Sequence, residues 1–213
     1  MKGYLVLGVL LFASCRSGRD LTEAQTDAVG RFELSMAYAR AGHDDLALLT
    51  IHKAIELEPG FIEARHFLAT ILEQRGEIEY AMVELDRILA IDPGYLPAGA
   101  HMGFLLVTLE RREEAKQWFN TCLDADENYV PALVNLGILL REEERAEDAI
   151  VFLSRAVQVA PKHANARVQY ARALTDADRV EDAREQWEAA LDCPGLKEEA
   201  RAEAEAALES PES

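Results

Sequence analysis

Basic residues are scarce in this chain of 213 residues, where 22 Lys and Arg stand against 39 Asp and Glu and leave a net charge of −17. A nucleic-acid-binding protein needs clustered Lys and Arg to displace counterions from phosphates, and the chain has no basic stripe of that kind. The same shortage means that anionic lipid head groups repel the chain. Nucleic acid is therefore excluded as a partner, and any membrane contact has to come from something other than charge.

Sequence motifs for catalysis or cofactor binding are also missing. The chain has no glycine-rich phosphate loop, and its few serines lack the context of a nucleophile elbow. Its carboxylates recur at helical i,i+3 and i,i+4 spacing with Arg and Lys, which is typical of solvated helix faces. His66 and His101 occupy neighbouring positions of the repeat described below, but no third ligand accompanies them. The sequence therefore predicts no enzyme, no metal, no cofactor and no small-molecule substrate.

The chain does contain a strict internal repeat. An alanine recurs every 34 residues, with no insertion or deletion over most of the sequence. A single globular core gives no reason for such a period, whereas stacked identical units each bury an apolar face against a neighbour. The period therefore predicts a helical solenoid and directs the search for function to a binding surface. The recurring alanines are Ala47, Ala81, Ala115, Ala149 and Ala183.

Other positions recur with the same period. Numbered from the first residue of each block of 34, block position 8 is always small and block position 11 is always large. Positions 7, 8 and 11 form one helical stripe, and positions 20, 24 and 27 form a second. Turn residues separate the stripes, and a proline ends three of the second helices. Each block is therefore predicted to be an antiparallel helix pair, and the blocks are 28–61, 62–95, 96–129, 130–163 and 164–197.

This pattern resembles the tetratricopeptide repeat, a 34-residue helix–turn–helix with small, large and proline positions. The resemblance covers residues 28–197 and implies an all-α, right-handed solenoid of five helix-pair repeats. Arg31, Arg65 and Arg167 depart from the family at block position 4, which often carries Trp. Residues 197–213 are predicted to form a capping helix and an acidic tail, because a solenoid needs its last apolar face shielded from water. The cap would use Leu196, Ala200, Ala204 and Leu208.

The beginning of the chain has a different character. Residues 1–14 read as a signal peptide, because a basic start precedes an apolar run of 10 residues that is too short to span a bilayer. The segment ending in Ala13-Ser14-Cys15 resembles the bacterial lipobox, which implies that Cys15 is lipidated and that residues 15–27 are a tether and the start of the first helix. An ordinary cleaved signal and a misread start are the alternatives. Arg16, by the same resemblance, favours the outer membrane, with the protein facing the periplasm.

The other two cysteines are expected to be unpaired. Cys122 lies in the third block and Cys193 near the end of the fifth. Helices pack about 8–10 Å apart, so elements two repeats apart lie beyond the Cα separation of about 7 Å that a disulfide tolerates.

The predicted binding surface lies on the first helix of each pair. In tetratricopeptide arrays these helices line the concave side, and block positions 5, 9 and 12 form the stripe beside the core. We expect the apolar members of this stripe to cluster and, as an exposed patch on an acidic protein, to bind a partner. The alternative is that the tether or the terminal helix of the chain fills the groove. The predicted groove residues are Phe32, Met36, His66, Thr70, Phe104, Val107, Val134, Asn135, Ile138, Arg141, Val168 and Arg172.

These features together favour a membrane-anchored adaptor. Tetratricopeptide co-chaperones grip a carboxylate with Lys and Asn at groove positions, and here only Asn135 fits that pattern. The combination of a lipobox and five repeats resembles the pilotin lipoproteins of type IV pili, which help outer-membrane secretins to assemble. The sequence therefore predicts a lipid-anchored scaffold that captures an apolar segment or an amphipathic helix of a protein partner. The alternatives are an enzyme or regulatory subunit of cell-wall metabolism, and a purely structural link in an envelope complex.

Overall fold

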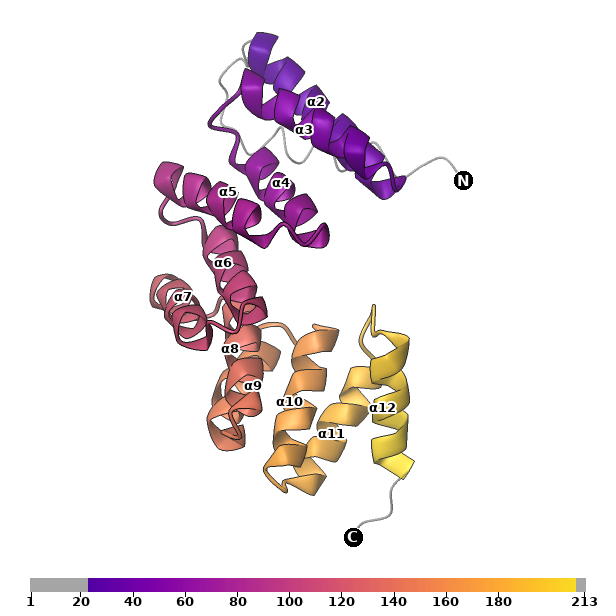
Figure 1. The fold of residues 1–213 in the computed structure, drawn as a ribbon. Coiled ribbons are helices and arrows are strands. Elements are labelled where there is room, and N and C mark those ends of the chain that lie inside the picture. Colours follow the sequence, from indigo (N-terminus) through magenta and orange to yellow (C-terminus); the bar gives the residue numbers. More distant parts are fainter. Residues whose placement is uncertain (1–22, 210–213) are drawn as a thin grey trace. The chain divides into compact units, whose positions relative to one another are not determined.

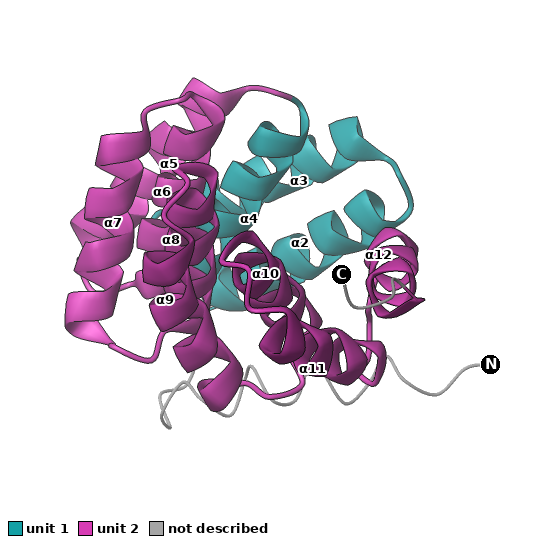
Figure 2. Cartoon of the chain, turned by 90° about the horizontal axis from the view of Figure 1, so that it is seen from below, with its two compact units in different colours: residues 1–75 teal, residues 76–213 magenta. Residues whose placement is uncertain are grey.

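A computed structural model describes residues 23–209, and within this range α-helices are the only regular secondary structure (Figure 1). The chain divides into two compact units, residues 1–75 and residues 76–213, and each is described by itself (Figure 2). The predicted signal peptide and the predicted lipidation site at Cys15 lie outside the described residues.

The first unit contains α2 (Glu23–Arg40), α3 (Asp44–Leu57) and α4 (Ile62–Gln74). Helix α2 packs against α3, and α3 packs against α4. The Ser35 hydroxyl of α2 donates a hydrogen bond of 2.7 Å to the carbonyl of Ala47 in α3, and both residues are fully buried. These residues hold block positions 8 and 20, so small side chains at both positions allow the two helices to approach closely.

The second unit continues the series of helices, and each helix packs against the next one along the chain. Helix α8 also contacts α6 and α10, which are its neighbouring first helices. The helices are α5 (Ile78–Ile91), α6 (Leu96–Thr108), α7 (Arg112–Ala125), α8 (Val130–Glu142), α9 (Ala146–Val159), α10 (Ala164–Asp176), α11 (Val180–Leu191) and α12 (Glu198–Glu209).

The core follows the recurring positions. All five alanines at block position 20 are buried, and the large residues at position 24 beside them are buried too. Helix α12 packs on α11 and fully buries Ala204, so it covers the end of the last pair. The predicted fold class, an all-α solenoid of helix pairs with a C-terminal capping helix, is confirmed.

Two glycines show how closely the helices of a pair approach. A Cβ atom on Gly103 would lie 2.5 Å from Cε1 of Phe119, and one on Gly137 would lie 2.5 Å from Cγ of Leu153. Both contacts join block position 8 of a first helix to position 24 of the second helix. The large residue therefore fills the space that the missing side chain leaves.

The turns between the paired helices share one backbone device. The residue at block position 15 has a positive φ in every repeat, and it is glycine only in the first two. Glu144 is one example, with φ of 60°, and the next amide, that of Arg145, donates to the carbonyl of Leu140 at 3.0 Å. This bond is the Schellman closure of a helix end, and it satisfies a carbonyl that the helix leaves unpaired.

The cysteines of the described range behave as expected. Cys122 and Cys193 are both buried and unpaired. Burial raises the pKa of the Cys122 thiol, so this sulfur is a small apolar filler rather than a nucleophile.

Replacing Gly137 by alanine tests the close approach of α8 and α9. We expect Gly137→Ala to lower the free energy of unfolding by roughly 1–2 kcal/mol, because overpacking a core costs about 1–3 kcal/mol and the better helix propensity of alanine returns at most about 1 kcal/mol. Urea unfolding followed by circular dichroism measures this loss.

Gly30→Ala is the matched control, because Gly30 is also inside a helix but a Cβ there meets nothing within 4 Å. When unfolding is measured at a protein concentration that keeps the chain monomeric, this variant should gain roughly 0.5–1 kcal/mol from helix propensity alone. Equal effects at the two positions would contradict the packing argument.

Candidate protein-binding surface

One exposed and two half-buried apolar side chains lie on the first helices of the second unit. Phe104 of α6 is 43% exposed, and Val107, one turn later, is half-buried. Ile138 is half-buried on α8, which contacts α6. We call Phe104, Val107 and Ile138 the Phe104 surface.

The sequence of the two helices makes this surface free of charge. Helix α6 has no Asp, Glu, Lys or Arg along its whole length, and α8 has none before Arg141. In a chain with a net charge of −17, a helix without any charged residue is unusual. The part of the surface on α6 can therefore accept apolar side chains without desolvating an ionised group of that helix, while on α8 the charged Arg141 follows Ile138 by one turn.

Two predicted groove residues are not at the surface. Val134 is 4% exposed and Val168 is 3% exposed, so the expectation that block position 5 is free of core packing is wrong in these repeats. Val134 belongs to a buried cluster with Leu133, Ala156 and Ala166. The reason is that α8 and α10 contact each other, so position 5 lies at the junction of neighbouring first helices.

The predicted polar residues on α8 are engaged within the chain. Asn135 donates from Nδ2 to the carbonyl of Pro131 at 2.9 Å. Arg141 donates from Nε to Asp176 at 2.5 Å and from Nη1 to Gln169 at 3.1 Å. Gln169, which is buried, donates in turn to Asn165 at 3.3 Å. A network therefore joins α8 to α10.

Arg172 on α10 is held by the capping helix. Its Nε and Nη2 atoms donate to the two carboxylate oxygens of Glu203 at 2.9 and 2.5 Å. The hydrogen bond to Glu203 raises the pKa of Arg172, so the guanidinium stays charged. A carboxylate of a partner could bind Arg172 only by displacing Glu203. Within the predicted groove, the apolar side chains of the Phe104 surface are therefore better placed to bind a partner.

The capping helix does not fill the whole predicted groove. It packs on α11 and reaches Arg172, while Phe104 keeps 43% of its surface exposed in the presence of this helix. The alternative that the terminal helix occupies the groove therefore does not apply to the Phe104 surface.

In the first unit the predicted residues form a smaller group. The Phe32 ring packs edge-on against Phe61 at a centroid distance of 5.2 Å and against Phe67 at 5.8 Å. Thr70 donates to the carbonyl of His66 at 3.1 Å, and both side chains are half-buried, as is that of Met36. Phe32 is thus partly used to join α2 to α4, a role that the periodic pattern of α2 alone did not reveal.

Two of the three arginines at block position 4, Arg65 and Arg167, have a structural role that sequence analysis missed. Arg65 donates from Nε to the carbonyl of Pro59 at 2.9 Å, and Arg167 donates to the carbonyl of Pro161 at 2.6 Å. In both cases the proline closes the preceding block, six residues earlier. The same Pro–Arg spacing recurs in two blocks of the sequence, and this recurrence could have indicated the contact.

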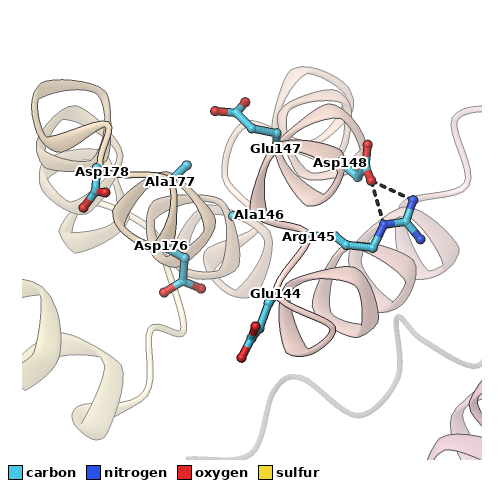
Figure 3. A pocket seen from close by; sticks show the side chains of 8 residues that line it. All are labelled: Glu144, Arg145, Ala146, Glu147, Asp148, Asp176, Ala177 and Asp178. Atoms are coloured by element: carbon cyan, nitrogen blue, oxygen red, sulfur yellow. Dashed lines mark hydrogen bonds and ion pairs between the residues drawn. The ribbon is translucent and has the colours of Figure 1, made fainter.

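An open hollow of about 370 Å³ lies beside the turns of the fourth and fifth repeats (Figure 3). Its charged residues are largely paired: Arg145 binds Asp148 at 2.6 Å, and Asp176 binds Arg141. Across residues 23–209, no group of three or more His, Cys, Asp or Glu side chains is placed to hold a metal ion. The lining residues are Glu144, Arg145, Ala146, Glu147, Asp148, Asp176, Ala177 and Asp178.

Comparisons with known proteins agree with the fold. Two family models, each described as a tetratricopeptide repeat, match residues 100–129 and 140–193. No curated protein matches the sequence.

Solved structures match most of the chain at low identity. A thermophilic tetratricopeptide-repeat protein of Thermus thermophilus is 20% identical with a TM-score of 0.71, over 85% of this chain and 98% of that one. The pilF protein of Pseudomonas aeruginosa is 18% identical with a TM-score of 0.74, over 88% and 89% of the two chains. PilW, a widely conserved type IV pilus biogenesis factor, is 21% identical with a TM-score of 0.70, over 89% and 91%. At these identities the likeness concerns the fold.

Proposed function

Because the chain folds as a tetratricopeptide-repeat protein, we propose that it is a protein-binding adaptor with no catalysis of its own. The Phe104 surface receives an apolar segment or an amphipathic helix of a protein partner. The observation that carries this proposal is a 43% exposed phenylalanine on a helix without charged residues.

The physics of association supports this surface. Burial of apolar area contributes about 25 cal/mol per Å², and aromatic side chains are prominent among the few residues that dominate binding energy. Phe104 is backed by Gly103 and Leu105, both buried, so its backbone is fixed before a partner arrives. Such preorganisation lowers the entropy lost on binding.

The proposal includes a lipid anchor at Cys15. No helix among residues 23–209 has both the length and the apolarity that crossing a bilayer demands. Acyl chains on Cys15 would contribute about 0.8 kcal/mol for each buried CH₂ group and would hold the adaptor at the bacterial outer membrane, facing the periplasm. A tethered binder meets other membrane-bound proteins at a raised effective concentration.

The cellular task that we propose is assembly of an envelope complex such as a pilus secretin. The similarity of fold to PilW, a type IV pilus biogenesis factor, supports this task, as does the lipobox-like sequence before Cys15.

The Phe104→Asp variant tests the binding surface. A photoreactive amino acid at Ile138 should capture the partner in cells, and Phe104→Asp should abolish that adduct, because a carboxylate in an apolar contact cannot be desolvated cheaply. The adduct is detected by immunoblotting and identified by mass spectrometry. Helix content should not change, since Phe104 is 43% exposed and the core does not depend on its side chain.

Val151→Asp is the control, because Val151 is 64% exposed but lies on α9, a second helix of its pair. This variant should keep the adduct. An adduct that survives Phe104→Asp, or a Phe104→Asp chain that loses its helices, would remove the Phe104 surface as the binding site.

The Cys15→Ala variant tests the anchor separately. It should move the protein from the membrane fraction to the soluble fraction, because the side chain that accepts the lipid is gone. Fractionation and immunoblotting measure the shift, with Cys122→Ala as the control that stays at the membrane. Retention of Cys15→Ala at the membrane would refute acylation at this residue.

A further inference from the structure

The free face of the first helix pair differs from its equivalents in the other repeats. At block positions 3, 7 and 10, the helices α4, α6, α8 and α10 bury 11 of 12 side chains where each packs on the helix before it. In α2 the same positions are exposed: Gly30, Leu34 and Ala37. Leu34 is 42% exposed, while its equivalents Leu68, Met102 and Leu136 are at most 3% exposed.

Local geometry places a second leucine on this face. Ser35 and Ala47 are both fully buried, and the Ser35 hydroxyl donates to the Ala47 carbonyl, so both residues lie on the faces where the two helices meet. In antiparallel helices that advance about 100° per residue, the residues just before them, Leu34 and Leu46, then lie on the same side. Leu46 is 44% exposed. Phe32, two residues before Leu34, turns the other way and meets Phe61 and Phe67 of the α4 region.

We define the end face as Gly30, Leu34, Ala37 and Leu46. Its large and small side chains alternate, and a Cβ on Gly30 meets nothing within 4 Å. In the other four repeats a packed second helix covers block positions 3, 7 and 10, whereas the equivalents of Leu46, such as Tyr80, stay exposed. The molecule itself therefore shows that the part of the end face on α2 fits the apolar side of a helix.

Little of the chain's own sequence is available to cover the end face. This step rests on the proposed acylation of Cys15, which leaves eight residues, 15–22, between the anchor and α2. Their sequence, CRSGRDLT, holds one large apolar residue, Leu21, and is much shorter than a helix pair. The C-terminal end of the second unit is closed, because α12 buries Ala204 and binds Arg172. A head-to-tail stack of copies is therefore blocked.

We propose that the end face is a two-fold contact between two copies of this chain. An isologous contact uses the same patch on both partners, so it needs a face that carries little charge of one sign. Helix α2, which carries most of the end face, holds three acidic and two basic residues, so two copies bring little net charge together there. Anchoring in one membrane raises their effective concentration further.

Two substitutions of matched exposure test this contact. In sedimentation experiments on the Cys15→Ala protein, the parent should form a concentration-dependent dimer. Leu34→Asp should raise its dissociation constant at least about tenfold, because the two-fold axis brings two carboxylates into an apolar contact. Phe104→Asp, at 43% exposure, should dimerise like the parent.

Disulfide trapping tests the same contact in the membrane. In the full chain, Leu34→Cys should yield a covalent dimer that reductant removes, while Phe104→Cys should not. A parent that stays monomeric at every concentration, a Leu34→Asp protein that dimerises normally, or equal trapping at both positions would overturn the proposal. Loss of helix content in a monomeric Leu34→Asp protein would do so too, since it would show that the chain covers its own end face.

The two proposals fail separately. Leu34→Asp should retain the adduct from Ile138, and Phe104→Asp should lose the adduct but retain the dimer. A dimer without any adduct from Ile138 would support the end face as the dimer contact and refute the Phe104 surface. An adduct without a dimer would refute only the end-face contact.

Discussion

The close approach of the two helices in each pair is the constraint on which the rest of the structure depends. It requires a small residue at block position 8, such as Gly137, against a large one at position 24, such as Leu153. Because the contact recurs with the strict 34-residue period, neighbouring pairs present matching faces, and one apolar ribbon runs through each unit. The surfaces of interest are what this ribbon leaves uncovered: Phe104 on a first helix, and Leu34 at the start of the series.

The fold could be predicted because it depends on the 34-residue period and on the size of the residues at fixed block positions. Small residues at positions 8 and 20 fix where helices approach, and both quantities are visible in the sequence. The binding surface was harder to predict from the sequence. Val134 and Phe104 both belong to the first-helix stripe, yet Val134 is buried and Phe104 is exposed. Periodicity gives the direction of a side chain on its own helix but not what the neighbouring helix places over it.

The polar part of the surface was beyond sequence reasoning for a similar reason. Arg141 and Arg172 read as free groove residues, but Asp176 and Glu203 neutralise them from the following first helix and from the cap. Long side chains choose among several partners within reach, and that choice depends on rotamers rather than on spacing. The ion pairs are partly exposed, so each contributes at most about 1 kcal/mol to stability. Their larger effect is on recognition, because they remove two cations from the surface offered to a partner.

The clamp between α12 and Arg172 also bears on how such a chain changes its length over evolution. A duplicated unit of 34 residues inserted between existing pairs preserves every contact, since each pair sees only its neighbours. A unit added after Glu209 would instead have to pack on the outer side of α12 or displace this helix. Displacement would expose Ala204 and would separate the Glu203 carboxylate from Arg172. The C-terminal helix thus closes the array, and a further unit fits between existing pairs rather than after this helix.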